Sequence, residues 1–95
     1  MTFLDKFRRK KEADPEQRRI HLLSYGRITD GVIIDTDTTP DGGEIVYYVY
    51  TLNGVDFESS DLLTPEQLLQ PVNYAPGARV GIRYDPRNQG NSILE

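Results

Sequence analysis

The sequence of 95 residues contains no cysteine and only one histidine, His21. The lack of cysteine excludes a disulfide framework, a thiol nucleophile and a thiolate metal ligand. His21 has no second histidine with which to hold a metal, and no serine lies in a nucleophile-elbow pattern. The Asp41-Gly42-Gly43 stretch is expected between strands, where it precedes no helix and forms no phosphate loop. These absences predict a structural or surface role for His21, no catalytic residue and no cofactor.

Long apolar runs are absent as well. No run approaches the ~20 residues that a membrane-spanning helix requires. The N-terminus has no apolar signal core ahead of its basic residues. We therefore expect a cytoplasmic protein, either free or peripheral to the inner face of the membrane.

Basic residues are scarce outside the N-terminal part of the chain. The net charge is −4, but residues 1–27 hold eight basic and four acidic residues, a balance of +4. Residues 28–95 hold three basic and eleven acidic residues, a balance of −8. The acidic body should repel phosphate backbones, so nucleic acid is not the expected partner. Any contact with an anionic surface belongs to the first 27 residues.

The first 13 residues form a basic leader ahead of a single domain that spans residues 14–95. One interpretation is a flexible, solvated terminus. The other is an amphipathic segment that contacts an anionic membrane surface, because apolar residues at helical spacing precede a run of cations. The residues of this predicted membrane contact are Phe3, Leu4, Phe7, Arg8, Arg9, Lys10 and Lys11.

A helix is predicted directly after the leader. Asp14 is a good N-cap and Pro15 suits the first helical position. Ile20 and Leu23 then share one helix face. We expect Gly26 to end this helix in a left-handed conformation.

A second, shorter helix is predicted within the segment 60–78. Thr64-Pro65-Glu66-Gln67 has the same capping logic, and Pro71 limits this helix to one or two turns. The segment is a long crossover between strands. We expect its leucines to plug one open end of the sheet.

The stretch EIVYYVYTLNGVDFESS carries the strongest strand signal. Asn53-Gly54 is the preferred pair for a type I′ hairpin turn. A turn of two residues sets Leu52 opposite Val55 and Tyr50 opposite Phe57. One face of the hairpin is therefore a predicted half-core of Val46, Tyr48, Tyr50, Leu52, Val55 and Phe57.

Alternation of apolar and polar residues predicts the remaining strands. Ile28, Val32 and Ile34 share one side of a first strand. Residues 79–84 form a fourth strand whose inward side chains are Val80, Ile82 and Tyr84.

The fourth strand should stop at Asp85-Pro86, because proline cannot donate to the ladder. The polar residues 87–91 are then a turn, and residues 92–94 return as a short fifth strand. Five short strands without alternating helices predict a mainly β fold. We expect a small five-stranded antiparallel barrel or rolled sheet with an N-terminal helix and a short crossover helix.

Residues 25–94 resemble a family, the domain of unknown function three-five-nine-two, found in small bacterial proteins. The matching motifs are a glycine-valine strand, a tyrosine-rich hairpin that ends in glycine, and a closing segment. They are carried by Gly31-Val32-Ile33, Gly54, Pro76-Gly77 and Val80 to Asn88. The family's usual proline after the asparagine is replaced by Gln89. The resemblance implies a small β domain with no established catalytic residues. Members are commonly tied to membranes by hydrophobic helices, which this sequence does not contain.

The acidic loop between the first two strands suggests a calcium site by composition, through Asp35, Asp37, Asp41 and Glu44. The spacing of a calcium loop is not met. Counted from Asp35, the position that requires glycine is Pro40, and the position that requires glutamate is Val46. We therefore predict a solvated acidic loop and no metal site.

Six tyrosines are many for this length and favour a binding surface. The hairpin register assigns some of them to the core. The candidates for partner contact are Tyr47, Val49 and Tyr74. The acidic body favours a basic peptide or an unidentified protein partner, and self-association by edge-strand pairing would also account for Tyr47 and Val49. The sequence thus predicts a non-enzymatic interaction module. Its alternatives are a peripheral membrane adaptor that uses the leader and an ion-dependent enzyme.

Overall fold

The computed structural model describes residues 15–95. Its sheet has the strand order β3-β2-β1-β4-β5, and every neighbouring pair is antiparallel. In chain order the elements are α2 (Pro15–Tyr25), β1 (Arg27–Thr38), β2 (Glu44–Leu52), β3 (Val55–Leu62), α3 (Pro65–Leu68), the 3₁₀ helix η1 (Pro71–Tyr74), β4 (Arg79–Asp85) and β5 (Asn88–Leu94). The predicted mainly β fold with an N-terminal helix and a short crossover helix is confirmed.

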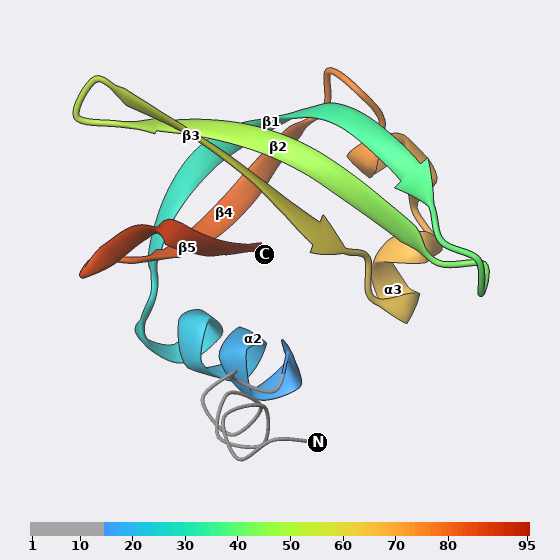
Figure 1. The fold of residues 1–95 in the computed structure, drawn as a ribbon, viewed down its shortest axis with the longest axis horizontal. Coiled ribbons are helices and arrows are strands. Elements are labelled where there is room, and N and C mark those ends of the chain that lie inside the picture. The colour runs from blue at the N-terminus through green and yellow to red at the C-terminus, as the bar shows by residue number, and fades with distance from the viewer. Residues whose placement is uncertain (1–14) are drawn as a thin grey trace, which may run out of the picture.

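The sheet curls into a nearly closed barrel. β3 and β5 are the two edge strands of the sheet, and the curl brings them beside each other. Figure 1 shows β1 and β2 arching over the top of the barrel, α2 below β5, and α3 beside the far end of β3. α2 therefore lies on the opposite side of the barrel from the outer face of β1 and β2.

The hairpin between β2 and β3 was predicted correctly from its turn. Asn53 and Gly54 adopt φ values of 52° and 78°, as a type I′ turn requires. Leu52 pairs with Val55 and Tyr50 pairs with Phe57. Of the predicted half-core only Val55 is exposed, at 54%, because it lies at the open tip of the hairpin.

The core fills the inside of the curled sheet. Tyr48 and Ile82 are fully buried, and the ring of Tyr50 stacks with those of Phe57 and Tyr84. The inward side chains predicted for β4 are confirmed. The buried cluster comprises Ile33, Val46, Tyr48, Tyr50, Leu52, Leu63, Ile82 and Leu94, with Phe57, Tyr74, Ala78, Val80 and Tyr84 packed against it.

The apolar side chains that alternation groups on one side of β1 do not face the core. Ile28, Val32 and Ile34 do share a face, but it is the outer face, where they are 57%, 37% and 43% exposed. The core residue is Ile33, which pairs with Tyr48. The register shifts after Ile33, so Ile34 is an extra residue in a β-bulge.

The N-terminal helix begins at Pro15 as predicted, while the predicted N-cap, Asp14, lies outside the described residues. Over residues 16–25 of the helix Leu22 is the buried residue, and Ile20 and Leu23 are exposed. The helix ends before Gly26, but the left-handed conformation predicted there is wrong. Glycine is needed for space instead, because a Cβ at Gly26 would press on the Leu22 carbonyl and lie 3.2 Å from the Tyr84 carbonyl.

The crossover helix has the capping box that its sequence predicts. The Thr64 hydroxyl accepts the Gln67 amide, and the Gln67 side chain accepts the Thr64 amide in return. The prediction that the leucines of this segment plug the barrel holds only for Leu63, which is buried. Leu68 and Leu69 are exposed, because a helix of four residues presents little of its surface to the barrel.

The turn before the last strand is tighter than predicted. Residues 87–91 were expected to form it, but β5 already begins at Asn88. The Asp85 carboxylate accepts the Arg87 amide at 2.9 Å, which closes the chain around Pro86 within two residues. Asp85 pairs with Asn88 and Tyr84 pairs with Ser92, so the polar residues 89–91 lie in β5 as extra residues at this register shift.

The seam between β3 and β5 is closed by side chains. The hydroxyls of Tyr48 and Ser92 share a hydrogen bond of 2.7 Å, and the Tyr50 hydroxyl donates to the Gln89 carbonyl at 2.5 Å. Asp61 of β3 accepts the Leu94 amide at 3.0 Å. These three bonds join the β2–β3 hairpin to β5 where the described strands form no backbone ladder.

Two arginines of α2 complete the outer edge of β5. Arg18 donates to the Ser92 carbonyl at 2.6 Å, and Arg19 donates to the Leu94 carbonyl at 2.9 Å. The Arg19 guanidinium also lies 3.9 Å from the Asp61 carboxylate. Because these edge groups have partners, this stretch of β5 is protected from pairing with another chain.

The carboxylate at the seam should make stability depend on pH. Burial raises the pKa of Asp61 above its ordinary value of 3.8, and the Leu94 amide and the charges of Arg19 and Arg18 offset this only in part. The folded pKa therefore exceeds the unfolded one, so the ionised carboxylate opposes folding at neutral pH. This penalty disappears as the pH falls through the folded pKa toward the unfolded value.

We expect the wild type to gain stability relative to an Asp61→Asn variant as the pH falls from about 7 to about 4. The asparagine can still accept the Leu94 amide, so the comparison isolates the charge. Urea denaturation of both proteins across this range measures the difference in free energy of unfolding. A difference that stays constant, or that moves the other way, would contradict the assignment.

Candidate functional site

The outer face of β1 and β2 carries an exposed apolar strip. Val32 pairs with Val49, and Asp35 pairs with Tyr47, so their side chains share this face. Ile34 joins them because the bulge turns it outward. We call this set, Val32, Ile34, Tyr47 and Val49, the outer strip. Two of the predicted partner residues, Tyr47 and Val49, are therefore brought together, and both are half-buried.

Acidic side chains flank the outer strip on β1 and β3, while on β4 the cation Arg79 pairs with Val32. Asp35 and Asp37 flank it on β1, Asp30 lies beyond Val32, and Glu58 pairs with Val49 from β3. Within residues 15–95 none of these four carboxylates has a cation within 4.0 Å. We call them the acidic rim, and the strip and rim together the outer patch.

The outer patch is hollowed in two places. One hollow of about 560 Å³ lies over Tyr47 and is lined by Ile34, Asp35, Asp37 and Glu58. The other, of about 390 Å³, lies between Val32 and Val49 and reaches Asp30 and Arg79. An extended peptide of a partner would place apolar side chains in these hollows and basic side chains on the rim.

Tyr74, the third predicted partner residue, does not belong to the outer patch. It ends η1, is half-buried, and packs against the core. The edge-pairing explanation of Tyr47 and Val49 is also wrong, because β2 lies between β1 and β3 and has no free edge. The predicted leader contacts, Phe3 to Lys11, lie outside the described residues.

Alternation alone did not identify the rest of the outer patch. Val32 and Ile34 were grouped correctly, but their face was not assigned. The signal that assigns it is the pairing of Gly31 with Tyr50 and of Ile33 with Tyr48, which directs the even-numbered residues of β1 outward as far as the bulge at Ile34. Once that register is known, Asp30 and Glu58 follow.

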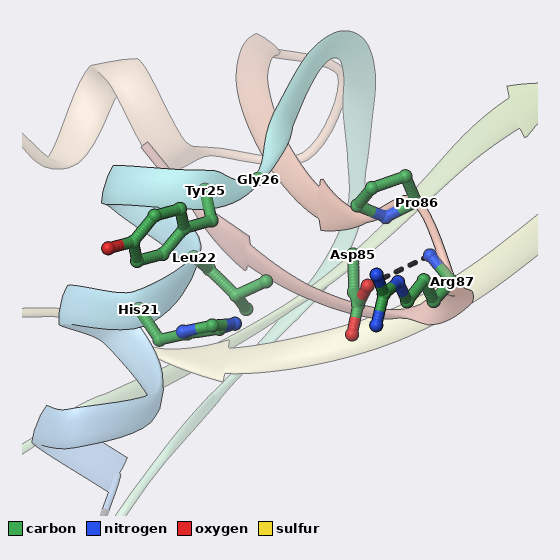
Figure 2. A pocket seen from close by; sticks show the side chains of 7 residues that line it. All are labelled: His21, Leu22, Tyr25, Gly26, Asp85, Pro86 and Arg87. Atoms are coloured by element: carbon green, nitrogen blue, oxygen red, sulfur yellow. Dashed lines mark hydrogen bonds between the residues drawn. The ribbon is translucent and has the colours of Figure 1, made fainter.

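A second hollow region lies between α2 and the β4–β5 turn. It encloses about 410 Å³, and Figure 2 shows His21, Leu22 and Tyr25 of the helix facing Asp85, Pro86 and Arg87. The Tyr25 hydroxyl points away from Asp85, and the rings of His21 and Tyr25 lie 5.1 Å apart. The Asp85 carboxylate already accepts the Arg87 amide, so it holds the turn.

The carboxylates of the acidic loop do not converge. Asp35 and Asp37 each accept the amide of the following threonine on β1. The Thr39 hydroxyl donates to Asp41 at 2.5 Å, which, with backbone amides, lowers the pKa of that carboxyl. In residues 15–95 no group of three or more histidine, aspartate or glutamate side chains is placed to hold a metal ion.

The part of the chain that the structure describes contains no helix that is long and apolar enough to cross a membrane.

A family model described as Domain of unknown function (DUF3592) matches residues 25–95. This range begins at the end of α2 and includes all five strands and the crossover. No curated protein and no solved structure matches the chain.

Proposed function

This chain belongs to the family described as Domain of unknown function (DUF3592), and we propose that it is a non-enzymatic interaction module whose outer patch binds a protein segment with apolar and basic side chains. The observation that carries the proposal is the coincidence of a partly exposed apolar strip with a rim of carboxylates that form no ion pair within residues 15–95. Each feature alone is common on protein surfaces. Their combination on one face selects for a partner that offers both kinds of side chain.

The apolar strip supports affinity. Val32 and Ile34 are 37% and 43% exposed although they lie in the middle of the sheet. Covering them, with Tyr47 and Val49, removes apolar surface from water at about 25 cal/mol per Å². The strands beneath are held on both sides, so little ordering is required when a partner binds.

The acidic rim supports specificity. Its carboxylates form no ion pairs with the described residues, so their negative charge is not neutralised there. A basic partner is therefore attracted and an acidic partner is repelled. Exposed ion pairs contribute only about 0.2–1 kcal/mol each. Binding should therefore weaken as salt rises from about 0.1 M to about 1 M, where the Debye length falls from ~10 to ~3 Å.

We expect a labelled peptide that alternates leucine with lysine to bind the full chain, and the double variant Asp35→Lys/Glu58→Lys to bind it at least about tenfold more weakly. Tyr47→Ala should also weaken binding, through lost apolar contact. Fluorescence anisotropy at low and high salt measures both. The matched control is Glu66→Lys, an exposed charge reversal on α3 outside the patch. Equal affinity for the patch and control variants would overturn the proposal.

A second candidate function is a peripheral membrane adaptor that uses the leader. It is supported by the position of α2, which lies on the opposite side of the barrel from the arch of β1 and β2 (Figure 1). A membrane on the α2 side of the barrel would lie away from the acidic rim. Each basic residue near an anionic surface adds about 1 kcal/mol. Co-sedimentation with anionic and neutral vesicles tests this candidate.

A further inference from the structure

We propose that the leader of one copy binds the outer patch of a second copy, so that the chain associates with itself head to tail. The inference rests on the proposed function, because it names the segment that the outer patch takes. It commits to residues 1–13 of a neighbouring chain as that segment.

The two surfaces match in chemistry. The leader presents Phe3, Leu4 and Phe7, followed by four consecutive cations from Arg8 to Lys11. The outer patch carries two exposed and two half-buried apolar side chains, flanked on β1 and β3 by four carboxylates that have no cation within 4.0 Å among the described residues. The basic leader and the acidic rim thus complement each other in charge.

The position of α2 favours a second copy over the same one. Phe7 lies eight residues before Pro15, and eight residues span at most about 28 Å when fully extended. Pro15 begins a helix on the side of the barrel opposite the outer patch (Figure 1). Figure 1 looks down the shortest axis of the body, so α2 and the outer face of β1 and β2 are separated along the 36 Å axis, which is longer than this span. The leader therefore reaches a neighbour's patch more readily than its own.

Such a contact joins two different surfaces. Each copy that donates its leader keeps its own outer patch free, and each copy that offers its patch keeps its leader free. A contact of this kind forms rings if the rotation between copies closes and open chains if it does not. Association should therefore continue beyond the dimer as concentration rises, and it should weaken with salt.

Sedimentation velocity of three full-length proteins tests the proposal. The wild type should increase in mass with concentration at low salt. The leader variant, with Arg8, Arg9, Lys10 and Lys11 each replaced by glutamine, should remain monomeric. The patch variant Asp35→Lys/Glu58→Lys should also remain monomeric, and Glu66→Lys should behave as the wild type does.

The decisive arm mixes the leader and patch variants. The patch variant supplies an intact leader and the leader variant supplies an intact patch, so the mixture should form one-to-one dimers and stop there. Dimers in the mixture also show that the patch of the leader variant is folded, and urea denaturation of the patch variant shows that its barrel is folded. The proposal is overturned if the leader variant associates as the wild type does, or if the mixture stays monomeric.

Two further outcomes separate the alternatives. Binding of the wild type to anionic vesicles without self-association would assign the leader to membranes and overturn this inference. Peptide binding that depends on Asp35 and Glu58, in a chain that never self-associates, would also overturn the inference but leave the proposed function standing. Self-association that is lost in both variants and restored in the mixture supports the inference.

Discussion

Replacing Tyr48 with alanine should lower the free energy of unfolding by about 3–5 kcal/mol. Tyr48 is fully buried in the middle of β2, and its ring lies 6.0 Å from that of Tyr50. Its hydroxyl shares a hydrogen bond with Ser92 across the seam, and burial raises its pKa above 10.0, so it stays protonated. The substitution opens a cavity and removes one of the bonds that close the barrel. Because small domains are stable by only about 5–15 kcal/mol, much of the stability is lost.

The neighbouring tyrosine is a matched control. Tyr47→Ala removes an equal ring from the outer face and should cost no more than about 1 kcal/mol. Tyr48→Phe keeps the ring but leaves the buried Ser92 hydroxyl without its partner, at about 1–3 kcal/mol. Urea denaturation of the three variants orders these costs. Equal losses for Tyr47→Ala and Tyr48→Ala would show that the register of β2 is wrong.

Replacing Leu22 with alanine should cost about 2–5 kcal/mol. Leu22 is 1% exposed and is the buried residue through which α2 packs on the barrel. Its loss should loosen the helix together with the bonds of Arg18 and Arg19 to β5. Thermal or urea denaturation measures the cost, and hydrogen exchange of the α2 amides reports the loosening.

The adjacent residue again supplies the control. Leu23 is 37% exposed, so Leu23→Ala should cost clearly less than Leu22→Ala. If Leu23→Ala proved the more damaging of the two, the helix would be rotated from the orientation described above.

The sequence predicted what depends on neighbouring residues. The hairpin follows from Asn53-Gly54, because a turn of two residues determines the pairing of everything beside it. The capping box at Thr64 is equally local. The phase of β1 is not local, because apolar residues lie on both of its faces and only the pairing of Ile33 with Tyr48 decides between them.

The outer patch was only partly predictable for the same reason. Tyr47 and Val49 follow from the hairpin, whereas the contribution of β1 requires its register against β2. The seam was not predictable at all. Arg18 donates hydrogen bonds to Asn91 and Ser92, which lie 73 and 74 positions later in the chain, and Arg19 donates one to Leu94, 75 positions later. No local sequence pattern predicts such pairs.

This seam has a consequence for the rate at which the domain opens. Contacts between residues so far apart in sequence require a large loop to close before they form, so they form late in folding. Interactions that are absent from the transition state set the unfolding rate and leave the folding rate almost unchanged. The hydrogen bonds of Arg18, Arg19 and Asp61 therefore lengthen the lifetime of the folded barrel by slowing its unfolding. Loosening them would expose the edge of β5 without slowing the formation of the hairpin.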